Sequence, residues 1–264
     1  MSEEFKETCR TKASSCGFEF FGVVDATELA RVQLPPHRGL RSPHSLLVEA
    51  RSVIVLGMYV WDPLFNAVIT SVIPDGTDPL DSEAVPGAQY YNFYYAITES
   101  RAYRFSQTLR DVGYKAIVTH SVHDKAAAAL AGLGWIGKQT LCITPLLGPR
   151  VRWCAVITDA ILPYDTPFAD DMCGDCELCV RSCPVDAIIP GPSRGVAPGQ
   201  KVDCQKCIIL QQRLAEPNEY WHKYAKKFTR RGFTECLICH DACPIGREEH
   251  VKRVKKYGAK PTAQ

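Results

Sequence analysis

The sequence lacks any apolar run long enough to cross a membrane, and we expect no secretory leader. A membrane helix needs roughly 18 consecutive apolar residues, and no such run occurs. The first residues, Met1 to Lys6, lack the basic segment and apolar core of a secretory signal. The formal net charge is only +2, so no global field favours nucleic acid or an anionic membrane. We therefore expect a cytoplasmic protein without a membrane partner.

Cysteine, by contrast, is abundant, with 13 in the chain. Without a secretory signal, this abundance indicates a reducing compartment and metal ligation rather than disulfides. The stretch from Cys173 to Pro184 has the spacing C-x2-C-x2-C-x3-C-P. Three thiolates two residues apart can surround one face of an iron–sulfur cube, while the fourth, before the proline, points to a second cluster. The alternative is a disulfide or zinc framework, although zinc normally takes two close pairs of ligands.

A second run, from Cys236 to Pro244, repeats the last part of this spacing, and a short pair lies between the two runs. The three groups hold one cysteine more than two four-cysteine clusters require. In the two-cluster arrangement each run gives its proline-flanked cysteine to the other cube. The first-cluster cysteines are therefore predicted to be Cys173, Cys176, Cys179 and Cys243. The second-cluster cysteines are Cys183, Cys236 and Cys239, with either Cys204 or Cys207 completing the set.

Apolar periodicity and glycine punctuation predict alternating helices and strands before the first run. Helices are expected over 2–16, from after Tyr95 to about Val112, and over 124–131, and strands over 18–24, 52–60, 114–119, 140–144 and 153–162. The 52–60 stretch is almost entirely apolar, which favours a strand buried on both faces. Residues 62–89 are rich in proline and glycine and are expected to form loops, which are either functional or an ordinary surface excursion. The cysteines outside the three groups, Cys9, Cys16, Cys142 and Cys154, are expected to be small buried residues.

Beyond the first cysteine run, helices are predicted over 204–214 and 217–229. The basic tail, 251–264, is either a solvated, partly disordered end or a contact for nucleic acid or a partner. The stretch from Tyr90 to Tyr95 has five aromatics in six residues. Some of these rings either line a pocket or simply pack in the core.

Three glycines, Gly132, Gly134 and Gly137, lie within six residues. Glycine lets the backbone approach a ligand closely. The spacing fits G-x-G-x-x-G, but the motif follows a predicted helix, whereas the dinucleotide fingerprint follows a strand. We therefore reject a dinucleotide site here.

The stretch Gly132–Lys138, the strand after it, the Thr158–Asp159 pair and the first cysteine run together resemble the epoxyqueuosine reductase family. The segments 16–23, 50–54 and 207–208 and the second run also resemble it, so the likeness covers about residues 16–246. The resemblance implies an α+β chain with a cobalamin-binding α/β domain related to the nitroreductase fold over 1–165. A ferredoxin-like domain with two 4Fe–4S clusters would follow over 166–250, and reductive dehalogenases would be distant relatives.

The resemblance also implies particular roles. Cys207 would complete the second cluster. The cofactor-binding residues would be Gly132, Leu133, Gly134, Trp135, Ile136, Gly137 and Lys138. Electrons from a low-potential donor of the ferredoxin or flavodoxin type would pass through the clusters to cobalt, and then to a small-molecule or protein-bound substrate. Lys138 and Arg150 would meet corrinoid amides or phosphate, or only solvent.

The sequence departs from the family where the proton donor is expected. The family has an Asp shortly before the Ala-rich helix, and the matching residue here is Val118 or Thr119. We therefore expect that epoxyqueuosine in tRNA is not the substrate. Candidate catalytic residues are His120, His123, Asp124 and Tyr94, since histidine, a buried carboxylic acid or a phenol can donate a proton. Asp124 can equally complement the helix dipole, and either histidine can be structural.

A second interpretation follows from the same departure. The chain would be an electron carrier or reductive activator that passes electrons from its clusters to a partner, for example a corrinoid protein. The reductase and the carrier differ in whether the chain itself retains cobalamin and consumes a small substrate.

Overall fold

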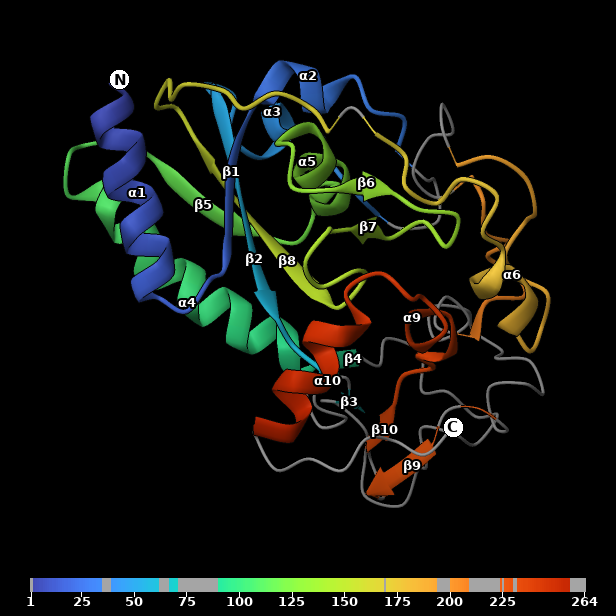
Figure 1. Cartoon of the computed structure of the whole chain (residues 1–264). Helices are drawn as coiled ribbons and strands as arrows, with labels where there is room; N and C mark the ends of the chain where they lie inside the picture. The colour runs from blue at the N-terminus through green and yellow to red at the C-terminus, as the bar shows by residue number, and fades with distance from the viewer. Residues whose placement is uncertain are drawn as a thin grey trace.

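A four-stranded antiparallel sheet forms the centre of the molecule (Figure 1). This computed structural model describes residues 2–34, 39–61, 67–70, 90–168, 170–193, 200–208, 224, 226–229 and 232–256. The strand order is β1-β2-β8-β5. The strands are β1 (Phe20–Asp25), β2 (Ser52–Tyr59), β8 (Val151–Thr158) and β5 (Ala116–Thr119).

Strands β2 and β8 occupy the middle of this sheet and pair along their whole length, with Val55 opposite Ala155. Seven of the eight residues of β2 and all eight of β8 are buried. Helices cover both faces of the sheet, so both sets of alternating side chains in these strands are mostly apolar, with Ser52, Arg152 and Thr158 as buried polar exceptions. The prediction of a strand buried on both faces is confirmed for 52–59.

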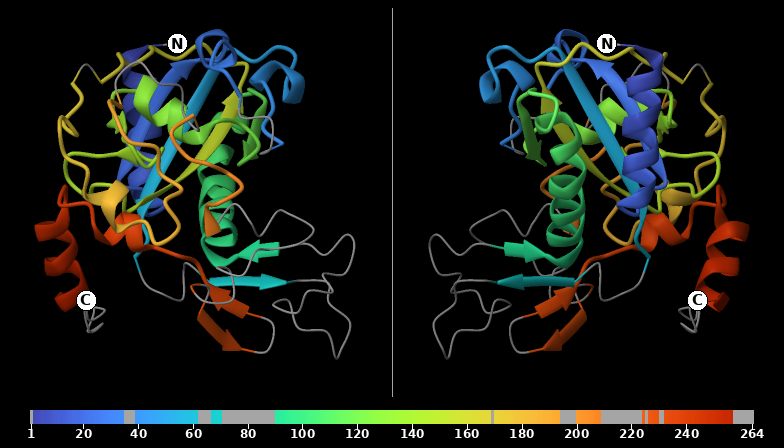
Figure 2. Two further views of the ribbon diagram at one scale, coloured as in Figure 1. Left: turned by 90° about the vertical axis from the view of Figure 1, so that its right-hand side faces the viewer. Right: turned by 90° about the vertical axis from the view of Figure 1, so that its left-hand side faces the viewer.

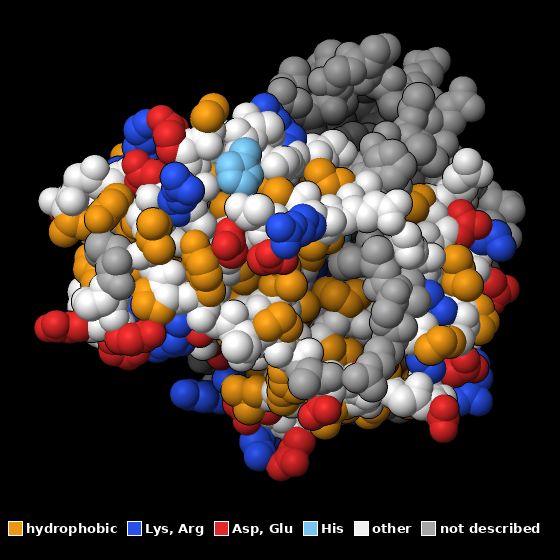
Figure 3. All heavy atoms as spheres, turned by 90° about the horizontal axis from the view of Figure 1, so that it is seen from above, with side chains coloured by type: hydrophobic (Ala, Val, Ile, Leu, Met, Phe, Trp, Pro, Cys, Tyr) orange, Lys and Arg blue, Asp and Glu red, His pale blue; other side chains and the backbone are white. Residues whose placement is uncertain are grey.

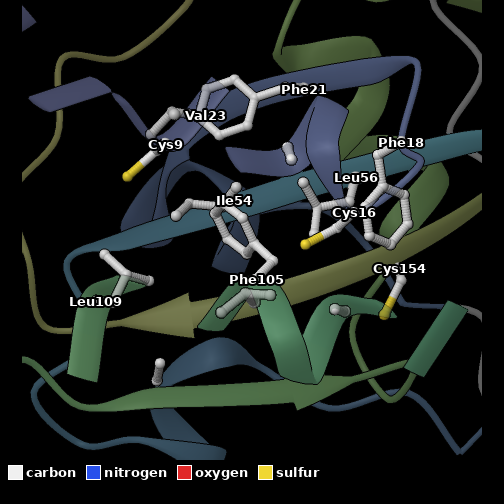
Figure 4. Close-up of a cluster of buried hydrophobic side chains, with 14 of the residues drawn as sticks. Cys9, Cys16, Phe18, Phe21, Val23, Ile54, Leu56, Phe105, Leu109 and Cys154 are labelled. Atoms are coloured by element: carbon white, nitrogen blue, oxygen red, sulfur yellow. The ribbon is translucent and has the colours of Figure 1, made fainter. Parts of the chain in front are cut away.

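One face of the sheet packs against α1 (Glu3–Ser15) and α4 (Phe93–Arg110). Figure 4 shows Ile54 and Leu56 of β2 facing Phe105 and Leu109 of α4. Cys9, Cys16 and Cys154 lie in the same apolar cluster, and burial raises the pKa of the Cys9 thiol to about 11. These thiols are therefore small core residues, as predicted.

The other face packs against α2 (Ala26–Ala30), α3 (Pro43–Leu46) and α5 (Asp124–Leu130). The alternate β2 residues, Val53 and Val55, point to this side. Small alanines of α5 let that helix lie close to β2 and β8. Cys142 is buried here too, which confirms the prediction for the last of the isolated cysteines.

A second antiparallel sheet lies beyond one end of α4 (Figure 2). Its strand order is β4-β3-β10-β9. The strands are β4 (Tyr90–Asn92), β3 (Ala67–Thr70), β10 (Gly232–Thr234) and β9 (Lys226–Thr229). The predicted loop over 62–89 therefore contains a strand at 67–70, and its other residues lie outside the described part. The helix predicted over 217–229 is wrong at 226–229, because pairing with β10 overrides local helix propensity. The helix predicted over 204–214 begins with a turn at 204–206 and is undescribed beyond 208.

The first part of the basic tail is an ordered helix, α10 (Arg247–Lys256). Arg253 makes ion pairs with Glu249 of the same helix and with Glu19, which precedes β1. Residues 251–256 are therefore helical rather than disordered, while Lys252, Lys255 and Lys256 are exposed, as a solvated end predicts, and the residues after 256 lie outside the described part.

The surface seen in Figure 3 carries both signs of charge interspersed among apolar side chains, with no broad patch of one sign. This mixture agrees with the formal net charge of +2. None of the helices in the described ranges is long and apolar enough to cross a membrane.

Candidate iron–sulfur site

The two cysteine runs fold next to each other although about fifty residues separate them in sequence. The first run carries α6 (Leu178–Ser182), which includes Cys179. The second carries α9 (Ile238–Asp241), which includes Cys239, and α6 packs against α9. The two short helices therefore bring the cysteine runs together (Figure 1).

The structure brings together the first-cluster cysteines. Burial first, and then the nearby Cys173, Cys243 and Cys176, raise the pKa of the Cys179 thiol to about 11. Cys243 comes from the second run and is near Cys173 and Cys176 as well. Cys243 of the second run therefore lies near cysteines of the first run, as the exchange predicted from the spacing requires. Iron binding by this set stays a prediction.

The second-cluster cysteines line a cavity of about 130 Å³. Cys183 comes from the first run, Cys207 from the segment between the runs, and Cys236 and Cys239 from the second run. Cys204 does not line this cavity, which agrees with the choice of Cys207. The other lining residues are largely apolar, among them Pro184, Val185, Ala187, Ile188, Val202 and Ile208.

The chemistry of these two sets fits iron–sulfur clusters. Burial and neighbouring thiols raise the pKa of Cys239 well above its usual value and that of Cys236 to about 11. Such thiols become thiolates when a metal binds them. In a 4Fe–4S cube each cysteine binds a different iron, so the four sulfurs do not converge on one point. Within the described ranges, no group of three or more His, Cys, Asp or Glu side chains is placed to hold a metal ion.

The glycine motif forms a tight hairpin of β6 (Trp135–Ile136) and β7 (Cys142–Ile143). A Cβ atom on Gly134 would lie 2.1 Å from the carbonyl oxygen of Ile143, and one on Gly132 would lie 2.4 Å from that of Thr166. The close approach that these glycines allow is therefore to this chain's own backbone. Contact between the residues 132–138 and a corrinoid stays a prediction.

The same hairpin borders the first-cluster cysteines. The indole nitrogen of Trp135 donates a hydrogen bond to Cys173 Sγ at 3.3 Å. A Cβ on Gly137 would lie 3.5 Å from the same sulfur. Lys138, expected to meet either a corrinoid or solvent, is buried at 3% exposure.

Arg150, which precedes β8, anchors the second cysteine run. Its guanidinium is 1% exposed and donates to the carbonyl oxygens of His240, Cys243 and Ile245 at 3.1, 3.0 and 2.9 Å. Arg150 is therefore shielded from solvent, which contradicts the solvent alternative, and its contact with a corrinoid stays a prediction. Its role depends on three carbonyl groups that are distant in sequence, and no local pattern signals it.

Three predicted catalytic residues, His120, His123 and Asp124, line a pocket of about 240 Å³ together with Tyr95. His120 Nδ1 lies 3.8 Å from Asp124 Oδ2, which is an ion-pair distance rather than a hydrogen bond. Burial opposes protonation of His120, but Asp124 and the Cys154 thiol outweigh it and raise the pKa of His120. Burial likewise opposes ionisation of Asp124, but His120 outweighs it and lowers the pKa of Asp124. Each of the two side chains therefore favours the charged form of the other.

His123 has a structural role at the start of α5. It is the N-cap residue, and its Nδ1 accepts a hydrogen bond from the backbone N–H of Ala126 at 3.3 Å. An N-cap side chain of this kind satisfies one of the unpaired N–H groups of the helix. Asp124 lies in the first turn of α5, so it also complements the helix dipole, the alternative role considered for it.

Tyr94, the fourth catalytic candidate, lies next to this pocket rather than in its wall. Its ring centroid is 4.4 Å from that of Tyr95, and the Tyr95 centroid is 4.5 Å from that of His120. Burial first, and then Tyr95 and Glu235, raise the pKa of Tyr94 well above its usual value. The side chains of Tyr90 and Tyr91 lie outside the described part.

Sequence reasoning missed the ion pair that connects Tyr94 to the second cysteine run. The Arg152 guanidinium lies 4.8 Å from the Tyr94 ring centroid and 3.8 Å from the Glu235 carboxylate. Asn92 also donates to Glu235 at 2.6 Å. Glu235 directly precedes Cys236, and this position next to a predicted cluster ligand is the one feature of the sequence that points to Glu235.

Comparisons with known proteins identify relatives over most of the chain, although no family model matches it. The epoxyqueuosine reductase of Cellulophaga algicola is 32% identical over 206 residues, which are 78% of this chain and 61% of that protein. The epoxyqueuosine reductase of Leadbetterella byssophila is 29% identical over 269 residues, which are 91% of this chain and 80% of that protein.

Solved structures agree at the level of the fold. Epoxyqueuosine reductase from Bacillus subtilis has a TM-score of 0.63 at 20% identity, over 93% of this chain and 66% of that one. A catabolic reductive dehalogenase has a TM-score of 0.60 at 18% identity, over 96% of this chain and 34% of that one.

The fold is therefore the mixed α/β fold shared by epoxyqueuosine reductases and reductive dehalogenases. The chain is a relative of the epoxyqueuosine reductases, as the resemblance predicted. It spans 61% and 50% of the length of the first two curated relatives. The expectation that tRNA is not a substrate gains no support, since one similar structure holds an epoxyqueuosine-modified tRNA stem loop. The division into nitroreductase-like and ferredoxin-like domains stays a prediction.

Proposed function

We propose that this chain is an iron–sulfur oxidoreductase whose first-cluster and second-cluster cysteines each hold one 4Fe–4S cluster. The observation that supports it most directly is the grouping of cysteines from both runs into two sets. The clusters supply single electrons. Arg150 keeps the second run against the central sheet, so its carbonyl contacts preserve the spacing between the sets.

The proposed electron acceptor is cobalamin, which then reduces a substrate not yet identified. Its support is the likeness in fold to a structure described as a B12-dependent reductive dehalogenase. The described residues around the second-cluster cysteines and His120 form pockets of about 130 and 240 Å³. These are smaller than the roughly 300–1,000 Å³ of drug-sized ligand sites, so these pockets alone do not fit a corrinoid.

His120 and Asp124 are the proposed proton source for the reduction. Asp124 keeps His120 protonated, and the pair faces a pocket in which a substrate group can reach it. A protonated imidazole in such a position can act as a general acid. Tyr95 packs against His120, and Tyr94 packs against Tyr95, so the two tyrosines are proposed as positioning residues for the His120 ring.

The test is anaerobic reconstitution with iron, sulfide and cobalamin, followed by metal analysis and visible spectra. We expect about eight iron atoms and about one cobalt per chain. Turnover is then measured with an epoxyqueuosine-modified tRNA stem loop, with the unmodified stem loop as control. His120→Asn and Asp124→Asn should retain both metals and lose turnover. Absence of bound iron would contradict the proposal.

An electron carrier for a partner corrinoid protein is the second candidate, favoured by the small size of the two pockets. In that case the reconstituted chain would bind about eight iron atoms and no cobalt. Its reduced clusters would be reoxidised rapidly when the partner is added, with no small substrate consumed. Retention of cobalt with substrate turnover would exclude this candidate.

A further inference from the structure

We infer that the hairpin of residues 132–141 is a shared wall for both clusters, and that Trp135 raises the reduction potential of the first through its N–H···S hydrogen bond to Cys173. The inference rests on the two clusters of the proposed function, and on neither a corrinoid nor a substrate. It assigns to the glycine motif a role toward iron and sulfur that is independent of cobalamin.

The contact with the first cluster is held by packing on several sides. Trp135 is 5% exposed, and its ring centroid lies 5.5 Å from that of Phe168. Its strand pairs directly with Ile143. This pairing needs glycine at 134, because a Cβ there would overlap the carbonyl of Ile143. The indole N–H is therefore fixed toward Cys173 Sγ at 3.3 Å.

The opposite end of the hairpin faces the second cluster. Gln139, Thr140 and Leu141 line the cavity of the second-cluster cysteines. The side-chain amide of Gln139 donates to the carbonyl oxygen of Cys239 at 3.4 Å. The stretch from Trp135 to Leu141 thus contacts both cysteine sets, which makes this hairpin a single structural link between them.

Thr140, in the turn of this hairpin, has a backbone conformation that is rare for a β-branched residue. Its φ is +62°, in the left-handed region that β-branched residues rarely adopt. Its N–H donates to the carbonyl oxygen of Gly137 at 2.8 Å and closes the turn. Strain of this kind persists where the surrounding structure enforces it and is concentrated at functional sites. Here the strained residue lies in the wall of the cavity.

The expected change in the reduction potential of the first cluster follows from the charge on its cysteine sulfurs. When a cluster takes up one electron from a low-potential donor, negative charge on its cysteine sulfurs increases. An N–H donor to a sulfur stabilises the reduced state more than the oxidised state, which raises the potential. Removing the donor should therefore lower the potential of the first cluster without a change in its ligands.

The test is an EPR-monitored redox titration of reconstituted Trp135→Phe, with Trp153→Phe as the matched control. Trp153 is equally buried, but it packs in the core against Phe20. We expect the first-cluster signal of Trp135→Phe to shift to a more negative midpoint potential, with unchanged iron content. Trp153→Phe should titrate like the wild type. Equal midpoint potentials in all three proteins would overturn the inference.

A second measurement covers the case in which Trp135→Phe loses its cluster. Wild-type protein is labelled with ¹⁵N at the tryptophan indole and reduced, and pulsed EPR then measures hyperfine coupling to nitrogen. We expect a ¹⁵N coupling to one cluster that persists in Trp153→Phe. A reduced wild-type cluster without this coupling would overturn the inference while leaving the proposed function intact. Absence of any cluster would instead remove the proposed function.

Discussion

Arg150 donates a hydrogen bond to the carbonyl oxygen of Cys243 at 3.0 Å, and so connects the start of β8 to a cysteine of the first cluster. The same guanidinium binds the carbonyls of His240 and Ile245. Gly148 and Gly246 allow the two backbones to meet, since a Cβ on either would lie within 2.2 Å of the opposite chain segment. The second cysteine run is thus positioned by the central sheet.

Arg150→Met should destabilise the protein and weaken retention of the first cluster. The change leaves three carbonyl oxygens without their donor in a buried environment. Removing one partner of such a buried charged network costs roughly 2–5 kcal/mol. Thermal unfolding and iron analysis measure both effects. Arg31→Met is the control, because Arg31 is exposed and pairs with Glu28. Equal stability of the two variants would contradict the anchoring role.

Cys207→Ser should remove the second cluster, whereas Cys204→Ser should retain it. Cys207 lines the cavity of the second-cluster cysteines, and Cys204 does not. Iron analysis after reconstitution should give about four atoms per chain for Cys207→Ser and about eight for Cys204→Ser. The opposite result would assign the ligand to Cys204.

Asp124→Asn should reduce stability by about 1–2 kcal/mol near neutral pH, because it removes the partner of a charged, largely buried histidine. The pKa of His120 is higher in the folded than in the unfolded protein. The contribution of His120 to the free energy of unfolding is therefore full below the unfolded pKa of about 6.5, and it is lost as pH rises through the folded pKa. The folded pKa of Asp124 is lowered, so its contribution is full above about 3.9 and is lost as pH falls through the folded pKa.

Denaturant unfolding of wild type and Asp124→Asn between pH 5 and 10 measures this difference. It should be largest at the acidic and neutral end and shrink at high pH. Glu49→Gln is the control, because the Lys115–Glu49 pair is exposed at the surface and such pairs contribute little. A constant difference between wild type and Asp124→Asn across this range would show that His120 is not protonated by its partner.

Gly134→Ala should be far more damaging than Gly113→Ala. A Cβ at 134 would lie 2.1 Å from a backbone oxygen, so β6 and β7 must separate. Overpacking of this kind costs about 1–3 kcal/mol or more. Gly113 has a φ of +91° but open space around it, so alanine there adds only the cost of a left-handed conformation. Thermal unfolding of the two variants is the measurement, and similar losses would contradict the close hairpin.

Local sequence patterns predicted a large part of the fold. The apolar stretch of β2, the helix ending before Gly17 and the Ala-rich α5 all depend on neighbours along the chain. The grouping of the cysteines could also be predicted, because the spacing of each run restricts which sulfurs can face one cube. The pairing of His120 with Asp124 was not predicted, because His120 precedes α5 and helical spacing does not place it beside Asp124.

Features that depend on distant segments could not be predicted. Strand β10 pairs with β3 across more than 160 residues, and no pattern within 226–229 distinguishes a strand from a helix. The roles of Arg150 and Arg152 depend on groups about 80–100 residues away. The hydrogen bond from Trp135 to Cys173 could not be predicted either. The cysteine spacing predicts that Cys173 is a ligand, but it does not indicate which residue donates a hydrogen bond to the sulfur of Cys173.

The most direct test of this account is iron and sulfide analysis of the anaerobically reconstituted chain, combined with EPR of the dithionite-reduced protein. Two clusters predict about eight iron and about eight sulfide per chain and a signal from reduced 4Fe–4S centres. Cys179→Ser should lower both contents by about half, because Cys179 belongs to the first-cluster cysteines alone. A chain that binds zinc instead, or that forms disulfides and takes up no iron, would contradict the account.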